Sequence, residues 1–373
     1  MEPKKRILIA YTTAGAGHMK AGTAVYEAFK KIDGNIDLKA VDLLEYSTPF
    51  MKSAYPAVYL FMINRAHLLW GFFYYLTDFR PFYLLLRFVL SLTNKIHCKS
   101  FEKLILDYKP SVVISTHFET SRITGDLIKS NRFNGKLINV LTDYGPHSFW
   151  IVDGVDKYIV GSDRAKRELI RKWKVREDKI EILGIPVNPV FSQTPDKDAL
   201  LSALGLQKGL STILIVSGGF GVGPIEELVT ELKDVKGLQL IVVCGKNPDL
   251  FKKINSMKIG VPSKIYGFSD NMHELMSVSD LIISKPGGIS TAETLAKGLP
   301  MIIISPVPGQ ETRNCRLLLE NRAAIKINGP KSARAAVKEF MDNPARISEL
   351  KDNAKNIARP NSAMDIARLG LSL

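Results

Sequence analysis

The 373-residue sequence is poor in cysteine and has no long uncharged apolar run. Its three cysteines are isolated, so they form neither a disulfide framework nor a metal-ligand spacing, and they suit a reducing cytosol. The N-terminal residues lack the apolar core of a secretory signal, and every apolar run is shorter than the roughly 20 residues that span a bilayer. The sequence therefore predicts a cytoplasmic chain without a membrane-spanning helix.

Acidic residues are also scarce, with 37 Asp and Glu against 51 Lys and Arg and a net charge of +14. This charge favours an anionic partner, either nucleic acid or an acidic membrane surface. Residues 46–101 favour the membrane, because they interleave aromatic and aliphatic side chains with Lys and Arg and contain Asp78 as their only acidic residue. The alternative is a set of core helices with a few exposed cations. We expect an anionic membrane surface and no nucleic acid as partner. The expected membrane contacts are Trp70, Phe72, Phe73, Arg80 and Arg87.

Short apolar runs alternate with helical patterns along the whole chain, which predicts an α/β fold with parallel sheets. The expected strands are residues 6–11, 109–117, 135–143, 156–160, 212–216, 238–245, 281–284 and 301–304. Residues 164–179 are expected to form one basic helix. Three prolines within residues 184–195 mark a hinge between domains. The predicted domains are 1–190, 191–350 and a C-terminal helix, 351–373, that returns to the first domain.

Residues 281–304 have the pattern of a strand, a glycine turn, a helix and a second strand. Gly287 and Gly288 would let backbone approach a ligand closely, and the helix start would favour a phosphate or diphosphate. There is a structural alternative for the same residues. Ser290 and Glu293 fit a capping box, in which Glu293 only stabilises the first turn of its own helix.

A second glycine loop, ending in Gly17 and His18, follows the first predicted strand. A histidine near a helix N-terminus is held neutral by the helix dipole, and a neutral imidazole can act as a general base. Without further context, a surface or core histidine is the alternative. His117, at the end of another apolar run, could face the cleft, but on its own it is interpreted as structural.

Several spaced motifs together resemble the GT-B glycosyltransferases of the monogalactosyldiacylglycerol synthase and processive diacylglycerol glucosyltransferase family. The peptidoglycan N-acetylglucosaminyltransferase is a more distant relative of that family. The motifs are Gly17–His18, residues 142–150, 267–272, 285–288, Glu293 and 308–314. The resemblance implies two Rossmann-like domains that face a central cleft. Met19 and Lys20 depart from the plant enzymes, which carry arginine in this part of the sequence.

The resemblance also implies roles for individual residues. His18 would be the catalytic base, and Asp143, His147 and Trp150 would lie on the acceptor side of the cleft. The implied UDP-sugar site consists of Gly17, Gly218, Gly219, Phe268, Met272, Gly287, Gly288, Ser290, Glu293, Gln310, Glu311 and Asn314. Within it Gln310 and Glu311 would bind the sugar hydroxyls.

The implied reaction is inverting, metal-independent transfer of a hexose from UDP-glucose or UDP-galactose to diacylglycerol or a glycosyl-diacylglycerol. No cofactor is expected, and no Asp-x-Asp motif stands at a predicted strand end. The expected location is the inner face of the cell membrane. One alternative is transfer of N-acetylglucosamine from its UDP form to a polyprenyl-linked or other acceptor. Another is a non-catalytic, membrane-associated protein that responds to nucleotide sugars.

Overall fold

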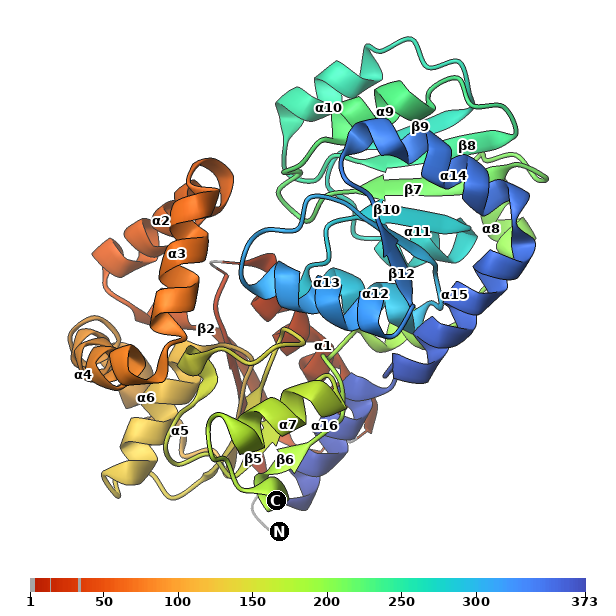
Figure 1. Ribbon diagram of the computed structural model, residues 1–373. Coiled ribbons are helices and arrows are strands. Elements are labelled where there is room, and N and C mark those ends of the chain that lie inside the picture. The colour runs from red at the N-terminus through yellow and green to blue at the C-terminus, as the bar shows by residue number, and fades with distance from the viewer. Residues whose placement is uncertain (1–3, 14, 33–34) are drawn as a thin grey trace. The chain divides into compact units, whose positions relative to one another are not determined.

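The computed structural model describes residues 4–13, 15–32 and 35–373, and Ala14 of the first glycine loop lies outside them (Figure 1). The chain divides into two compact units. Unit 1 contains Met1–Pro189, Pro308–Arg313 and Asn361–Leu373. Unit 2 contains Val190–Val307 and Asn314–Pro360.

The described part of unit 1 is built on a six-stranded parallel sheet with the order β2-β1-β3-β4-β5-β6. Its strands are β1 (Arg6–Tyr11), β2 (Asp37–Asp42), β3 (Val112–Ser115), β4 (Lys136–Val140), β5 (Lys157–Ile159) and β6 (Ile180–Glu181). Central strands are buried on both faces, so they consist of continuous apolar residues rather than alternating ones. This explains why short apolar runs located most of them.

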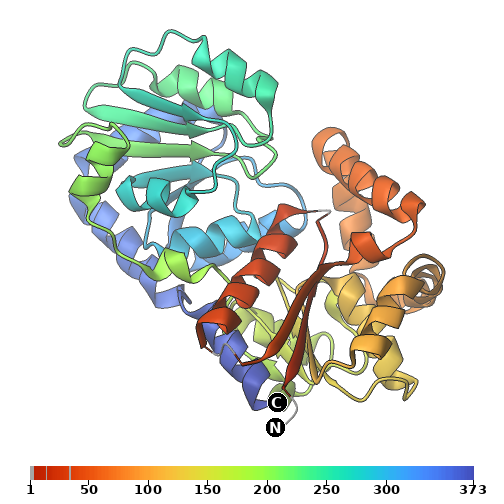
Figure 2. The same ribbon diagram turned by 180° about the vertical axis from the view of Figure 1, so that it is seen from behind.

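Successive side chains of β1 enter two different cores, because side chains alternate across a strand. Ile7 and Ile9 pack with α1 (Ala16–Ile32) and α16 (Ser362–Ser372), which lie side by side in Figure 2. Leu8 and Ala10 belong to the core on the opposite face. That core is closed by α5 (Lys99–Tyr108), α6 (Phe118–Lys129) and α7 (Asp163–Arg171).

Three further helices stand between β2 and β3: α2 (Pro49–Arg65), α3 (His67–Thr77) and α4 (Arg80–His97). Thr48 caps α2 and Pro49 begins it, which is the usual place for proline in a helix. α3 ends at Thr77 with Asp78 as its C-cap residue, and α4 begins with a proline in its first turn. These helices carry the apolar, cation-rich segment recognised in the sequence.

The described part of unit 2 contains a second six-stranded parallel sheet, in the order β12-β11-β10-β7-β8-β9. Its strands are β7 (Ser211–Val216), β8 (Leu238–Val243), β9 (Ser263–Tyr266), β10 (Leu281–Ser284), β11 (Met301–Ile303) and β12 (Ala324–Lys326). The helices are α8 (Lys197–Ala203), α9 (Ile225–Leu232), α10 (Pro248–Asn255), α11 (Met272–Val278), α12 (Gly288–Ala296), α14 (Ala333–Asp342) and α15 (Pro344–Ile357). α13 (Gln310–Glu320) begins among the unit 1 residues and continues among those of unit 2. The two parallel sheets confirm the predicted α/β class with two Rossmann-like units.

Two predicted helices are wrong in extent. The basic helix expected over 164–179 ends at Arg171, and Lys174 takes a left-handed backbone (φ 59°) before a short 3-10 turn. The C-terminal helix expected over 351–373 is interrupted between Ile357 and Ser362, because a proline at 360 cannot continue a helix. The 3-10 segments are η1 (Leu43–Tyr46), η2 (Ser148–Trp150), η3 (Glu177–Lys179), η4 (Pro189–Ser192) and η5 (Pro330–Ser332).

Candidate active site

His18 lies in the first turn of α1, directly after the loop that connects β1 to this helix. Its Nδ1 is 2.7 Å from the backbone carbonyl of Thr116 and 3.1 Å from Oγ1 of Thr142. A carbonyl oxygen only accepts hydrogen bonds, so Nδ1 carries the proton and Nε2 holds the lone pair of the neutral ring. Thr116 also donates from its hydroxyl to the His18 carbonyl, at 2.8 Å. These contacts fix both the ring and its backbone.

Burial lowers the pKa of His18 to about 4, although the hydrogen bond to the Thr116 carbonyl acts in the opposite direction. The ring is therefore neutral throughout the physiological range, as the sequence predicted. The dominant cause is different, however. The helix dipole is the cause expected from the sequence, whereas loss of solvent around the ring makes the largest contribution.

A pocket of about 370 Å³ opens beside His18, and every residue that lines it belongs to unit 1. The residues predicted for the site that line this pocket are His18, Asp143, His147, Trp150, Gln310, Trp70 and Phe73. Most of the other lining side chains are aromatic or aliphatic and come from α2, α3 and the start of α6. A pocket of this kind can enclose the apolar part of a ligand while a few polar groups orient it.

His117, interpreted from the sequence as structural, caps α6 and also lines the pocket beside the predicted base. Its ring meets the His18 ring edge-on, with 4.6 Å between centroids, and stacks on Phe118 at 4.2 Å. Its Nδ1 accepts a hydrogen bond from the backbone N–H of Glu119. Burial, with His18 nearby, lowers the pKa of His117 well below its ordinary value. Both imidazoles are therefore neutral together.

Glu119 and two tyrosines also line the pocket and were not predicted from the sequence. Burial raises the pKa of Glu119, while Arg122 and a hydrogen bond from Asn94 partly offset that rise. Tyr55 and Tyr59 come from α2, and their neighbours in the sequence are mostly apolar. A signal for them would have required knowing that α2 packs against Gly15 and His117, which follow β1 and β3 in the chain.

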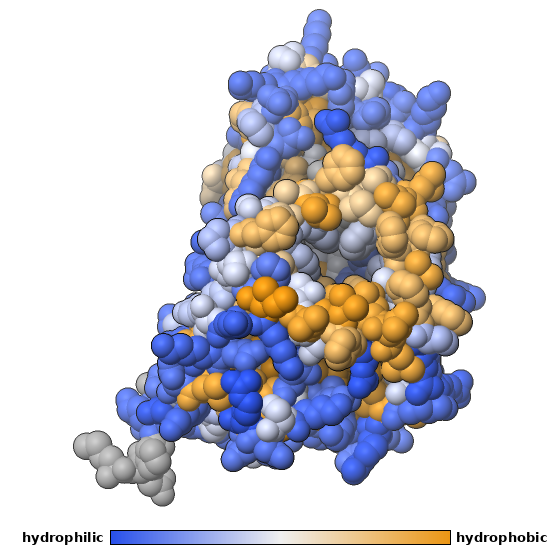
Figure 3. Space-filling view, turned by 90° about the vertical axis from the view of Figure 1, so that its left-hand side faces the viewer, coloured by the Kyte–Doolittle hydropathy of each residue, from blue (hydrophilic) through white to orange (hydrophobic). Residues whose placement is uncertain are grey.

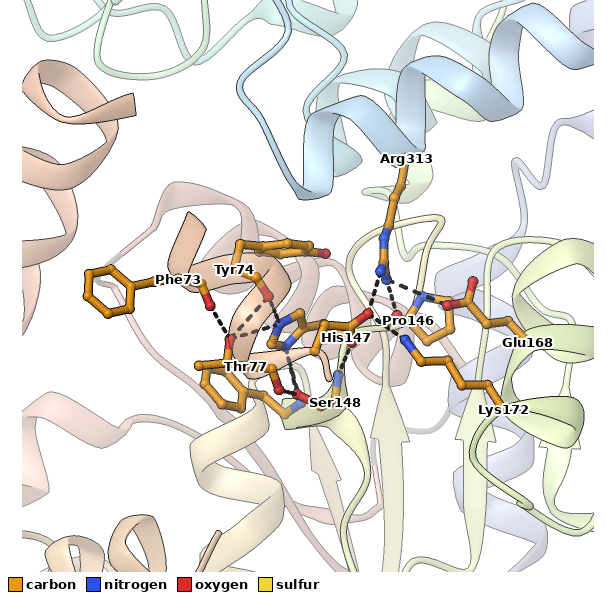
Figure 4. A network of polar contacts seen from close by, with 11 residues as sticks. Phe73, Tyr74, Thr77, Pro146, His147, Ser148, Glu168, Lys172 and Arg313 are labelled. Atoms are coloured by element: carbon orange, nitrogen blue, oxygen red, sulfur yellow. Dashed lines mark hydrogen bonds and ion pairs between the residues drawn. The ribbon is translucent and has the colours of Figure 1, made fainter. Parts of the chain in front are cut away.

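His147 is committed to structural hydrogen bonds rather than to proton transfer (Figure 4). Its Nε2 lies 2.9 Å from the Tyr74 carbonyl, to which it donates, and its Nδ1 accepts from the Phe149 N–H. Burial lowers the pKa of His147 to about 4, against the opposing effect of Asp78. The ring joins the turn before η2 to helix α3.

Gln310 reaches the pocket from the start of α13. Its Oε1 accepts a hydrogen bond from Nε1 of Trp70 at 3.3 Å. Trp70, predicted as a membrane contact, therefore turns its ring nitrogen toward the pocket side of α3. Glu311 lies close enough to Tyr59 to contribute to the raised pKa of that phenol, behind the larger effect of burial. Gly17, Gln310 and Glu311 are the predicted donor-site residues found in unit 1.

The other predicted donor-site residues lie in unit 2. Gly287 is in the turn between β10 and α12, and Gly288, Ser290 and Glu293 are in α12. Gly287 is the N-cap, no side chain caps the helix, and α12 begins at Gly288. The capping-box alternative is therefore wrong, because Ser290 lies inside the helix rather than before it. Glu293 is 5% exposed, and the Asn314 side chain donates to the Pro286 carbonyl at 3.0 Å. Asn314 thus stabilises the turn between β10 and α12 through its hydrogen bond to Pro286.

Two further loops come after β7 and β9, the strands on either side of β8 in the sheet of unit 2. Gly218, after β7, has φ 65° and open space where a side chain would project, and Gly219 is next to it. Phe268, after β9, is 45% exposed and lies beneath the Lys246 ammonium, 5.2 Å from the ring centroid. Met272 is buried at the start of α11.

Exposed apolar side chains gather on helices α2, α3 and α4, and Figure 3 shows the face that carries them. Phe72 and Phe73 are 61% and 45% exposed, as expected of membrane contacts. Arg80 is exposed, whereas Arg87 is partly buried with Nη2 3.6 Å from Asp153. The most exposed members of this apolar face are Phe50, Val58, Phe61, Leu68, Phe72, Phe79, Leu85 and Phe88. A contiguous apolar surface of this kind marks an interaction site.

Within the residues that the structure describes, no helix combines the length and the hydropathy needed to cross a bilayer.

Comparisons with known proteins identify the family of this chain. Residues 18–187 match the family model for monogalactosyldiacylglycerol (MGDG) synthase, and residues 212–365 match that of the glycosyltransferase family 28 C-terminal domain. A processive diacylglycerol beta-glucosyltransferase of Bacillus licheniformis is 29% identical, over 97% of this chain and 94% of the relative. The protein of the same description from Bacillus cereus strain AH187 is 30% identical, over 97% of this chain and 91% of the relative.

Solved structures show the same fold at low identity. MurG of Acinetobacter baumannii superposes with a TM-score of 0.60 and 14% identity, over 100% of both chains. The S. aureus MnaA–UDP complex gives a TM-score of 0.61 and 13% identity, over 97% of this chain and 94% of that one. The fold is that of the GT-B class. Within that class, the chain belongs to the glycosyltransferase family of the MGDG synthases and processive diacylglycerol glucosyltransferases.

Proposed function

We propose that this protein transfers a hexose from UDP-glucose or UDP-galactose to the hydroxyl of diacylglycerol, or of a glycosyl-diacylglycerol, at an anionic membrane surface. The relatives' descriptions support the acceptor class. The observation that carries the proposal is the state of His18: a buried, neutral imidazole whose Nδ1 is engaged by a carbonyl, on the wall of a largely aromatic pocket. Such a ring has Nε2 available to accept the proton of a bound hydroxyl.

The reaction begins with that proton transfer. The acceptor hydroxyl donates to Nε2 of His18, and its oxygen attacks the anomeric carbon of the donor sugar. As the new C–O bond forms, the bond from the anomeric carbon to the diphosphate oxygen breaks, and UDP leaves with the electron pair. A single direct displacement inverts the configuration.

Unit 2 would bind the donor, with the backbone around Phe268 at the uracil and Glu293 at the ribose. Gly287 and Gly288 leave room for the diphosphate at the start of α12, whose N–H groups favour anions. In this proposal helix and backbone dipoles stabilise the leaving diphosphate without a metal ion. Gln310 and Glu311 would bind the sugar hydroxyls, since amides and carboxylates suit that task.

The exposed apolar face of α2–α4 would enter the headgroup boundary of the membrane, which would bring the lipid acceptor to the pocket. The net charge of +14 would add attraction to anionic lipid. Both features lie outside the requirements of sugar transfer itself, so they support a lipid rather than a soluble acceptor.

The test is a transfer assay on vesicles of anionic lipid and diacylglycerol, with UDP-glucose, UDP-galactose and UDP-N-acetylglucosamine offered separately. His18→Asn is the informative variant, because an Asn amide can still donate to the Thr116 carbonyl but cannot take a proton. We expect a glycosyl-diacylglycerol from one of the two hexose donors with the wild type, and none above background with the variant.

Each other outcome has a defined meaning. Product only from UDP-N-acetylglucosamine would reject the hexose donors and favour the alternative transferase. UDP binding without product or UDP release from any donor would reject the lipid-acceptor proposal and favour a non-catalytic nucleotide-sugar-binding protein.

A further inference from the structure

Residues Pro308–Arg313 belong to unit 1, although the chain on both sides of them belongs to unit 2. Helix α3 and its C-cap residue make the contacts that hold this segment. Pro308 lies against Gly71, where an added Cβ would come within 2.9 Å of the proline Cβ. Gly309 (φ 101°) lies against the Tyr74 ring in the same way, at 2.8 Å. The segment can approach this closely because positions 71 and 309 are glycines.

Hydrogen bonds and an ion pair complete the contact. Trp70 donates to Gln310, and Arg313 donates from Nη2 to Oδ2 of Asp78 at 2.6 Å. The contacting positions on α3 are 70, 71, 74 and 78, which share one face of a helix. Segment 308–313 is therefore bound along its length to one face of α3 and its C-cap.

The ion pair of Arg313 and Asp78 is well shielded from water. Asp78 is 5% exposed, and the side chain of Arg313 is 19% exposed. Burial alone would raise the pKa of Asp78, but Arg313, with His147 and Lys172, outweighs it and holds that pKa below its ordinary value. Arg313 also donates to the Pro146 carbonyl, and its guanidinium lies 5.4 Å from the centroid of the Tyr74 ring (Figure 4).

Asp78 has other partners that remain if Arg313 is changed. Lys172 donates to the same carboxylate oxygen at 2.5 Å, and the Ser148 N–H donates to the other oxygen at 2.8 Å. Loss of the Arg313 guanidinium thus leaves the buried carboxylate with a cation and a backbone donor. The change removes the contacts that Arg313 makes, while the packing of Pro308 and Gly309 and the Trp70–Gln310 hydrogen bond stay in place.

We propose that Arg313 is a positioning residue for the donor sugar: its ion pair with Asp78 fixes segment 308–313 on α3 and so sets where Gln310 lies in the pocket. The inference rests on the proposed function, in which Gln310 binds sugar hydroxyls. Arg313 itself touches neither substrate. It controls discrimination between glucose and galactose donors, and it leaves nucleotide affinity unchanged.

The experiment compares Arg313→Gln with Arg316→Gln on vesicles that contain diacylglycerol. Arg316 lies on the same helix, is exposed and pairs with Glu320 one turn further on, so its variant controls for lost charge. We expect Arg313→Gln to lower kcat/KM for the preferred donor about tenfold and to reduce the preference between the two hexoses, because contacting residues couple by such amounts. The Kd of UDP alone should stay within about twofold of the wild-type value. Arg316→Gln should match the wild type in kcat/KM, in donor preference and in the Kd of UDP.

Two further variants separate positioning from simple stabilisation. Asp78→Asn should reproduce the loss of discrimination, and the double variant should be no worse than the poorer single one, because both remove the same contact. Arg313→Lys should recover part of the donor preference, since it keeps the charge.

A lower thermal midpoint with unchanged donor preference in Arg313→Gln would overturn the inference and leave the proposed function intact. Additive losses in the double variant would overturn it as well. A wild type that transfers no hexose from either donor would overturn the proposed function, and the inference with it.

Discussion

The two units share a six-stranded parallel sheet but differ in the segments that connect their strands. In unit 1 the helix after β1 carries His18 in its first turn, and the connection after β2 expands into the three helices α2–α4. In unit 2 the helix after β10 begins at Gly287 and Gly288, and no side chain caps it. The connections between the strands of unit 2 are shorter than the three-helix connection of unit 1. The strand–loop–helix segment of unit 1 therefore carries an imidazole, and that of unit 2 carries backbone N–H groups at the start of its helix.

This difference assigns separate tasks to the units in the proposed reaction. A buried neutral imidazole suits the acceptor hydroxyl, which must lose a proton. Open N–H groups at a helix start suit a diphosphate, which must keep its charge. Substitution of His18 in unit 1 should therefore affect turnover, and substitution of Gly287 in unit 2 should affect donor binding.

The largest effect is expected at the base. His18→Asn should lower kcat by about 10²- to 10⁴-fold, the range of general base catalysis, with the Kd of UDP within about twofold. Stopped assays on diacylglycerol vesicles and calorimetry with UDP measure the two quantities. If His18→Asn retained more than a tenth of the wild-type kcat, His18 would not be the base, and the separate catalytic task given to unit 1 would be contradicted.

The matching substitution in unit 2 should give the opposite pattern. Gly287 has φ −65°, so alanine fits its backbone, but the methyl group would stand between the helix start and the diphosphate. Gly287→Ala should weaken UDP binding about tenfold, equivalent to about 1.4 kcal/mol, while kcat at saturating donor changes little. Titration of UDP into the variant decides this. Unchanged affinity would mean that the diphosphate does not lie at α12.

A smaller and separate effect is expected for the apolar face of α2–α4. The triple variant Leu68→Ser, Phe72→Ser, Phe88→Ser should reduce binding to anionic vesicles about tenfold or more, because each buried side chain of this size contributes about 1.5–3 kcal/mol. Leu319→Ser removes an exposed apolar side chain from unit 2 and is the control. Vesicle sedimentation measures binding. Equal binding by both variants would contradict a membrane role for α2–α4.

The smallest effect is a predicted insensitivity to pH. A base with a pKa of about 4 is deprotonated, and therefore active, at every pH well above 4, and activity is lost as the pH falls through that value. Titration of His18 should accordingly change kcat/KM by less than about twofold between about pH 5.5 and 7.5. An acidic limb with its midpoint near the ordinary histidine value of about 6.5 in the wild type, absent from His18→Asn, would show an exposed rather than a buried imidazole.

The strands and glycine loops could be predicted from the sequence because their signals are local. Continuous apolar runs located β1 and β10 to within the residue. The helix expected over 164–179 failed because its charges suit a helix, while Lys174 adopts a left-handed backbone that the sequence does not indicate. Solvent-facing charge patterns do not say where a helix ends.

The pocket could be predicted only in part. His18, His147 and Trp150 were recognised through motifs, but His117 and Tyr55 were not, since packing brings them together from the start of α6 and from α2. Nor could the sequence indicate that residues 308–313 attach to α3, because that contact joins Trp70 to Gln310, positions 240 residues apart. The binding of the donor by the residues named for it stays a prediction.

The anomeric configuration of the product tests the central claim, that a neutral His18 promotes one direct displacement. Wild-type enzyme with UDP-α-glucose and diacylglycerol should yield a β-linked glucolipid, read from the coupling constant of the anomeric proton. An α-linked product would require retention, which a single base-assisted attack does not produce, and would contradict the account.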